Sequence, residues 1–157
     1  MWYYMRGDFM KILVLNGPNL NMTGIRKKNV YGAETLADIN TQLKEYGESK
    51  GAEMFFYQSN HEGAIIDVIH QSKDDYDGVV INAGAYTHYS YAIRDAIEAV
   101  SDYTPYVEVH MSDIHAREDF RKISVITDVC VKQISGFVRI VTKWVLIYYV
   151  KYCKIYG

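Results

Sequence analysis

Short apolar runs alternate along the chain with longer segments in which apolar residues recur every three or four positions. The runs lie at residues 12–15, 53–57, 79–81, 106–110 and 129–134. The first run is nearly all apolar and does not alternate with polar residues, which suits a parallel strand covered on both faces. Five strands separated by helical segments predict βαβ units with right-handed crossovers, and hence an α/β domain built on one parallel sheet.

The spacing of apolar residues also predicts the helices. One helix is expected to begin at Thr35, because Thr35 and Asp38 have the pattern of a capping box and the apolar residues after them recur at steps of three and four. Gly51 is expected to end this helix. Further helices are predicted after residues 58–63, over 90–100, and from about 138 to 149. Polar loops are predicted over residues 16–32, 82–88 and 111–121.

One domain is expected from 157 residues of which 49% are apolar and 23% are charged. Residues 1–9 lack an apolar run long enough for a signal-peptide core, so we interpret them as an N-terminal extension to a single domain over 10–157. The longest apolar run, 144–150, is much shorter than the roughly 20 residues that a membrane-spanning helix requires. We therefore expect no membrane span.

Charge, cysteine content and the absence of common motifs limit the classes of partner and cofactor that the sequence predicts. The formal net charge of -2 and the pI near 6.2 provide no general attraction for nucleic acids, although an anionic small molecule remains a possible partner. Cys130 and Cys153 have neither CxxC nor metal-ligand spacing, so reduced thiols in a cytoplasmic protein are expected in preference to a disulfide. The sequence has no GxGxxG, GxxxxGK[ST] or HExxH motif, and His110 and His115 lack a third ligand at a recognisable spacing. We expect no cofactor and no metal.

Polar residues follow each of the first four predicted strands. They are Asn16 and Asn19, then Asn60 and His61, then Asn82 and His88, and finally Glu108, His110 and Ser112. Carboxyl ends of parallel strands lie on one edge of a sheet, so these side chains are expected to converge there. Any single asparagine would more simply satisfy a turn. Their recurrence after four strands favours a binding or catalytic site.

Four segments resemble the type II 3-dehydroquinate dehydratases. They are LNGPNLNMTGIR with Tyr31-Gly32, QSNHEG at 58–63, INAGAYTH with AIRDAI, and VEVHMSDIHAREDFR at 107–121. They occur in the family's order and spacing, from residue 11 to about residue 137. The resemblance implies a flavodoxin-like fold with strand order 2-1-3-4-5 and a dodecamer built as a tetramer of trimers. It also implies the loss of water from 3-dehydroquinate to give 3-dehydroshikimate in aromatic amino acid biosynthesis, without a cofactor.

The resemblance also implies roles for individual residues. Such an elimination requires a base, stabilisation of an enolate, and an acid for the departing hydroxyl. Tyr31 is expected to be the base and His88 the acid. Bringing a tyrosine pKa from near 10 toward 7 requires about 4 kcal/mol, which the neighbouring cations Arg26 and Arg117 are expected to supply. The remaining implied site residues are Asn19 and Glu108 for catalysis, and Asn82, Asp95, His110, Met111, Ser112 and Arg121 for the substrate.

Simpler explanations exist for several of these residues. Tyr31 alone would be a half-buried surface aromatic, His88 alone a helix cap, and Asp95 a solvated helix residue unless it reaches into a neighbouring subunit. Glu108 and His110 alternate on one face of a strand, so the carboxylate is expected to fix the tautomer of the imidazole. The alternative for this pair is an ordinary buried ion pair.

The chain also departs from the family pattern. Lys27 and Lys28 make the loop before Tyr31 more basic, and Ala83 stands where a proline is usual. After residue 137 the similarity fades, and the last segment is expected to be a helix on the sheet or an extended oligomer contact. Two other functions remain open: a flavodoxin-like binding or signalling module, and a dehydratase that uses a lysine imine.

Overall fold

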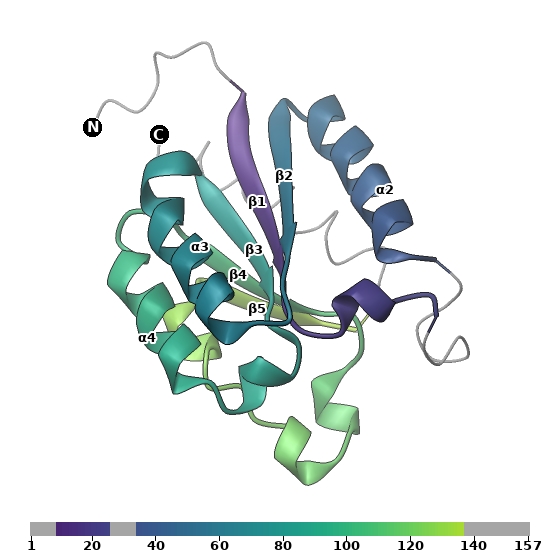
Figure 1. Ribbon diagram of the computed structural model, residues 1–157, viewed down its shortest axis with the longest axis vertical. Coiled ribbons are helices and arrows are strands. Elements are labelled where there is room, and N and C mark those ends of the chain that lie inside the picture. The colour runs from purple at the N-terminus through teal and green to yellow at the C-terminus, as the bar shows by residue number, and fades with distance from the viewer. Residues whose placement is uncertain (1–8, 26–33, 137–157) are drawn as a thin grey trace.

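A five-stranded parallel sheet forms the centre of the protein in the computed structural model, which describes residues 9–25 and 34–136 (Figure 1). Its strands are β1 (Met10–Asn16), β2 (Ala52–Gln58), β3 (Gly78–Asn82), β4 (Tyr106–His110) and β5 (Lys132–Ser135). They lie in the order β2-β1-β3-β4-β5, and every neighbouring pair is parallel. The predicted α/β class and the flavodoxin-like strand order 2-1-3-4-5 are therefore confirmed.

Helices cover both faces of this sheet. The helices α3 (Glu62–Asp75) and α4 (Tyr91–Val100) pack on one face, and α2 (Leu36–Ser49) packs on the other (Figure 1). Short 3₁₀ helices lie in the described connections: η1 (Leu20–Met22), η2 (Gly84–His88), η3 (Ile114–Ala116), η4 (Asp119–Arg121) and η5 (Thr127–Val129). None of the described helices is long and apolar enough to cross a membrane.

Strand β1 is buried on both faces, as its unbroken apolar sequence predicts. Successive side chains of a strand point to opposite faces. Leu13 and Leu15 accordingly belong to the apolar cluster under α3 and α4, whereas Ile12 and Val14 belong to the cluster under α2. All four side chains are buried. Because helices on both faces pack against β1, the turn that follows Asn16 begins at a fixed point between β2 and β3.

The predicted start of α2 is confirmed in detail. The Thr35 hydroxyl accepts a hydrogen bond from the Asp38 amide, and the Asp38 carboxylate accepts one from the Thr35 amide. The backbone amides at the N-cap and at the third helical residue are thereby satisfied. Gly51, at φ 79°, follows the last turn and leads directly into β2. The sequence signals at 35, 38 and 51 therefore set the position of α2 against the sheet.

Two segments differ from the sequence prediction. The fifth strand was expected from residue 129, but it begins at Lys132, because the amides of Val129 and Cys130 bond back to Ile126 and Thr127 in the turn η5. Residues 84–88 form the short helix η2 instead of an open loop. The predicted helix over 138–149, the N-terminal extension and the segment that contains Arg26 and Tyr31 lie outside the described residues.

Candidate active site

The turns after β1, β2 and β3 begin at one level of the sheet. Asn16 is in register with Gln58 on one side and with Asn82 on the other. The Gly17 amide donates to the Asn82 carbonyl at 2.7 Å, and the Ser59 amide donates to the Asn16 carbonyl at 3.1 Å. The three turns are thus joined by backbone hydrogen bonds at the carboxyl edge of the sheet, where ligands bind in open α/β folds.

Close backbone contact between two of these turns requires a glycine. A Cβ atom at Gly17 would lie 2.4 Å from the Ala83 carbonyl oxygen, which is closer than any side chain can approach. The Asn82 side chain accepts a hydrogen bond from the Gly84 amide at 3.2 Å and is itself buried. These contacts fix the asparagine at the end of β3, so its side chain has a defined position at the site.

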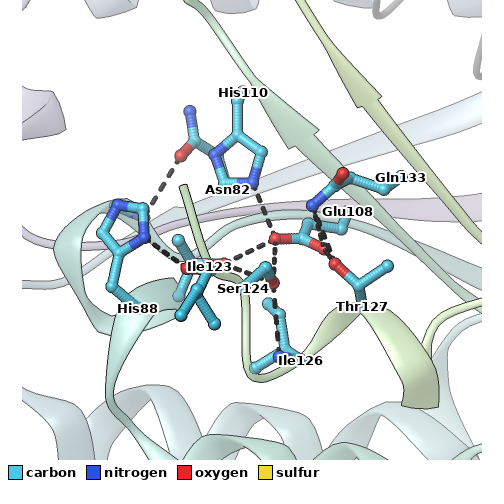
Figure 2. Close-up of polar contacts among 11 residues, drawn as sticks. Asn82, His88, Glu108, His110, Ile123, Ser124, Ile126, Thr127 and Gln133 are labelled. Carbon is cyan, nitrogen blue, oxygen red and sulfur yellow. Dashed lines mark hydrogen bonds and ion pairs between the residues drawn. The ribbon is translucent and has the colours of Figure 1, made fainter. Parts of the chain in front are cut away.

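Glu108 is the most enclosed charged group among the described residues, with no exposed surface. Its Oε1 accepts hydrogen bonds from Thr87 at 2.5 Å, Ser124 at 2.6 Å and His110 at 2.6 Å; its Oε2 accepts from Thr127 at 2.5 Å and Gln133 at 3.1 Å (Figure 2). Burial by itself raises the pKa of Glu108, but the hydrogen bonds outweigh it and lower the pKa to about 2. The carboxylate is therefore ionised at neutral pH.

His110 is oriented by this carboxylate. Its Nε2 lies 2.6 Å from Glu108 Oε1, and its side chain is 6% exposed. An ionised carboxylate only accepts hydrogen bonds, so Nε2 carries a proton and Nδ1 is the ring nitrogen left for other partners. The arrangement matches the sequence prediction that Glu108 would fix the tautomer of His110.

His88 lies at the end of η2 and faces the same region. Its Nδ1 is 2.7 Å from the Ile123 carbonyl oxygen, which can only accept, so Nδ1 carries a proton. Figure 2 shows the Asn82 side chain pointing toward the His88 ring, with His110 close by. Two imidazoles and a buried amide from three separate segments therefore meet beside the Glu108 carboxylate.

Four of the predicted site residues lie on the loop that follows β4. Met111 lines a cleft between α2 and the sheet together with Asn16 and Asn82. Arg121 pairs with Glu118 at 3.2 Å. Ser112 and Arg117 lie on the same loop, on either side of η3. The loop that follows His110 thus carries a hydroxyl and two guanidinium groups.

Asn19 and Asp95 are two predicted site residues with exposed side chains. Asn19 immediately precedes η1, in the turn after β1, and is exposed. Asp95 lies on α4 with its side chain 73% exposed, 3.5 Å from the Arg94 guanidinium. Arg26 and Tyr31 fall outside the described residues, so their predicted places are not described here.

The sequence prediction missed the neutral groups around Glu108. Thr87, Ser124, Thr127 and Gln133 come from three segments and all donate to one carboxylate. The available signal was a pair of hydroxyl residues, Ser124 and Thr127, placed within the otherwise apolar segment 123–126 and its end. In the described part of the chain, no group of three or more histidine, cysteine or acidic residues could hold a metal ion.

The flavodoxin-like sheet, with a buried carboxylate–histidine pair where β4 ends, defines a class of α/β protein whose site holds groups suited to acid–base chemistry. Residues 10–144 match the family model for class II dehydroquinase. The 3-dehydroquinate dehydratase of Bacillus cereus (strain G9842) is 55% identical over 127 residues, which cover 81% of this chain and 86% of that protein. The chain therefore belongs to the class II dehydroquinase family.

Solved structures agree with this membership. The type II dehydroquinase from Butyrivibrio crossotus DSM 2876 superposes with a TM-score of 0.84 at 49% identity, covering 91% of this chain and 98% of that one. The type II dehydroquinase from Propionibacterium acnes gives a TM-score of 0.87 at 38% identity, covering 92% and 98%. The similarity thus extends over nearly the whole length of these relatives.

Proposed function

We propose that this protein is a hydro-lyase that removes water from 3-dehydroquinate to give 3-dehydroshikimate, a step of aromatic amino acid biosynthesis. The observation that supports it most directly is the ionised Glu108 on His110, beside Asn82 and His88, at the edge where the family motifs meet. Removing a proton next to a ketone and protonating a departing hydroxyl are steps that such groups can serve.

The base in this proposal is Tyr31, with Arg26 and Arg117 beside its phenolate. Proton removal leaves an enolate, whose negative charge must be stabilised by a donor positioned in advance. Asn19 is proposed for this role, because its side-chain amide is an N–H donor in the turn after β1, within the motif that resembles the family. The reaction needs no electron transfer, since a C–H bond and a C–O bond break and one C=C bond forms.

Two histidines are candidates for the acid. The family resemblance implies this role for His88, whose Nδ1–H faces the uncharged Ile123 carbonyl. When neutral, each ring offers only a lone pair to the leaving hydroxyl, at Nε2 of His88 and at Nδ1 of His110, so the acid must be a protonated ring. His110 instead pairs with an ionised carboxylate, which orients the ring and balances a positive charge on it. These contacts favour His110 as the acid, with His88 as a second group at the leaving hydroxyl.

The substrate carries a carboxylate and hydroxyl groups, and the proposed binding residues suit both. They are Asn82, His110, Met111 through its amide, Ser112, Arg121 and Asp95. Asp95 is proposed to act from a neighbouring subunit within a dodecamer of four trimers. Its 73% exposed side chain on α4 is accessible for such a contact. The cytoplasmic location expected from the sequence stays a prediction.

The decisive test follows the enone absorbance of the product after 3-dehydroquinate is added to metal-free protein. We expect turnover, which Tyr31→Phe nearly abolishes. A loss in His110→Ala of 100-fold or more, with a smaller loss in His88→Ala, would support His110 as the acid, and the reverse order would return the role to His88. Tyr103→Phe and His70→Ala, at exposed positions away from the site, are the matched controls.

Folded, oligomeric protein that gives no absorbance change would refute the proposal. Tight binding of a flavin or nucleotide without turnover would then favour a binding module. Inactivation by borohydride only when substrate is present would instead indicate a lysine imine, because the reductant traps that intermediate covalently.

A further inference from the structure

The turn after β1 contains the only non-glycine residue of the described chain with a positive φ. Asn19 has φ 65° and ψ -1°, in the left-handed region. Glycine would adopt this backbone without strain, and asparagine is among the few other residues that tolerate it. The Asn19 side chain does not cap η1, the helix that it precedes. The left-handed backbone is thus compatible with asparagine, and the side chain is not used to cap η1.

Two side chains at the end of β2 hold this turn from one side. The Asn60 Oδ1 accepts a hydrogen bond from the backbone N–H of Asn19 at 2.9 Å and another from Gln58 Nε2 at 3.1 Å. The same Gln58 nitrogen also donates to the Gly17 carbonyl at 3.1 Å. Gln58 and Asn60 together thus fix the backbone at both ends of the segment 17–19.

The same turn also contacts the end of β3. Asn82 and Ala83, at the end of β3, contact the backbone of Gly17, as described above. Asn60 is held in turn from η2, because the Tyr86 hydroxyl donates to the Asn60 carbonyl at 3.2 Å. The segment 17–19 therefore lies between the ends of β2 and β3 and is hydrogen-bonded to both. Asn60 is the side chain that contacts Asn19, through the Asn19 backbone amide.

We propose that Asn60, oriented by Gln58, is a positioning residue that fixes the Asn19 side chain for the dehydration. This rests on the proposed function, in which Asn19 stabilises the enolate. A group aimed at developing charge must be placed within a fraction of an ångström, and small displacements cost large factors in rate. Asn60 therefore acts on kcat through Asn19 without touching the substrate.

The first test compares two substitutions at one position. Asn60→Asp keeps the oxygen that accepts from the Asn19 amide, whereas Asn60→Ala removes it. We expect Asn60→Asp to stay within about threefold of the wild-type kcat, and Asn60→Ala to lose roughly 10- to 100-fold in kcat with a much smaller change in KM. Equal activity of wild type and Asn60→Ala would overturn the proposal.

A double-mutant cycle separates positioning from a general structural effect. Asn19→Gly removes the side chain and leaves a residue that accepts the backbone conformation without strain. In the Asn19→Gly background, Asn60→Ala is expected to change kcat by less than about twofold, because the group that it positions is already gone. The same loss in both backgrounds would show independent effects and overturn the proposal.

Hydrogen exchange reports on the contact without using activity. Asn60→Ala is expected to speed exchange in the peptide that contains residues 17–23, and Asn60→Asp is expected to leave it unchanged. Unaltered exchange in Asn60→Ala would overturn the proposal. Wild-type protein without turnover would refute the proposed function and the positioning role together, whereas an active wild type with an equally active Asn60→Ala variant refutes the positioning role alone.

Discussion

Replacing Glu108 with glutamine is expected to remove a pH-dependent part of the protein's stability. The pKa of Glu108 lies at about 2 in the folded protein, against an ordinary value of 4.5. This lowering corresponds to about 3 kcal/mol of stabilisation when the carboxyl is ionised in both states. The side chain has no exposed surface, so solvent does not screen its interactions. The ionised carboxylate is therefore a large contributor to a typical stability of about 5–15 kcal/mol.

The direction of the pH dependence follows from the sign of the shift. A carboxyl whose pKa is lowered by folding stabilises the protein above its unfolded pKa, and the contribution disappears as pH falls toward the folded pKa. With pKa values of 4.5 and about 2, the contribution of Glu108 is about 3 kcal/mol at pH 7 and about 1.5 kcal/mol at pH 3. Glutamine has no such dependence.

The assay is urea unfolding followed by circular dichroism at pH 7, 5, 4 and 3. All samples must have the same protein concentration, because oligomerisation also contributes to apparent stability. The difference in unfolding free energy between wild type and Glu108→Gln should shrink by about 2 kcal/mol between pH 7 and pH 3. Glu45→Gln, an exposed carboxyl on α2, is the matched control and should show no comparable trend.

A difference that stays constant within about 0.5 kcal/mol over this range would refute the reasoning, because it would mean that the hydrogen bonds do not hold Glu108 ionised. A difference that grows as pH falls would also refute it, since that is the sign of a carboxyl whose pKa folding raises. Either result would remove the physical basis for treating Glu108 as a permanent anion beside His110.

Three further predictions concern the elements that position the site, each measured by urea unfolding at pH 7. Thr35→Ala removes the hydroxyl that caps α2 and should cost about 1 kcal/mol; Thr35→Ser should restore most of it, and equal losses in both would contradict the capping role. Gly17→Ala places a Cβ 2.4 Å from the Ala83 carbonyl oxygen and should lower the free energy of unfolding by about 3 kcal/mol or more. Gly63→Ala, with open space around it, is the control and should cause no loss. Similar effects of the two substitutions would exclude the close approach. Tyr106→Phe removes a buried hydroxyl that lies 2.7 Å from the Ser72 hydroxyl on α3, and it should lower the free energy of unfolding by about 1 kcal/mol. An unchanged urea midpoint would show that this hydrogen bond contributes nothing.

The sheet and its helices could be predicted because their signals are local. Thr35 and Asp38 are three residues apart, and the apolar run at 12–15 needs no distant partner to indicate a strand buried on both faces. That the strand ends would share one edge of the sheet could be predicted from topology alone. Parallel strands place Asn16, Gln58 and Asn82 at one level, whatever their side chains are. Local patterns and one rule of connection thus account for most of the architecture.

The surroundings of Glu108 could not be predicted, because they depend on contacts between segments far apart in the sequence. Thr87 is separated from Glu108 by 21 residues and Gln133 by 25, and neither spacing has any meaning in a strand or helix. The late start of β5 has the same origin. Thr127 lies in η5, where its hydroxyl reaches Glu108, so the segment forms a turn where apolar content alone predicted a strand.

The neutral donors also determine what Glu108 can do for His110. A carboxylate whose only partner were an imidazolium would lose much of its stabilisation whenever that ring became neutral. Glu108 keeps three hydroxyl groups and one amide when His110 changes its charge, so the carboxylate remains satisfied in either state. In the proposed reaction, His110 gives up and regains a proton at Nδ1 while its Nε2–H stays bonded to Glu108, so its ring keeps one orientation. A pair built in this way suits repeated proton transfer better than an isolated ion pair does, because the anion does not depend on the proton that is transferred.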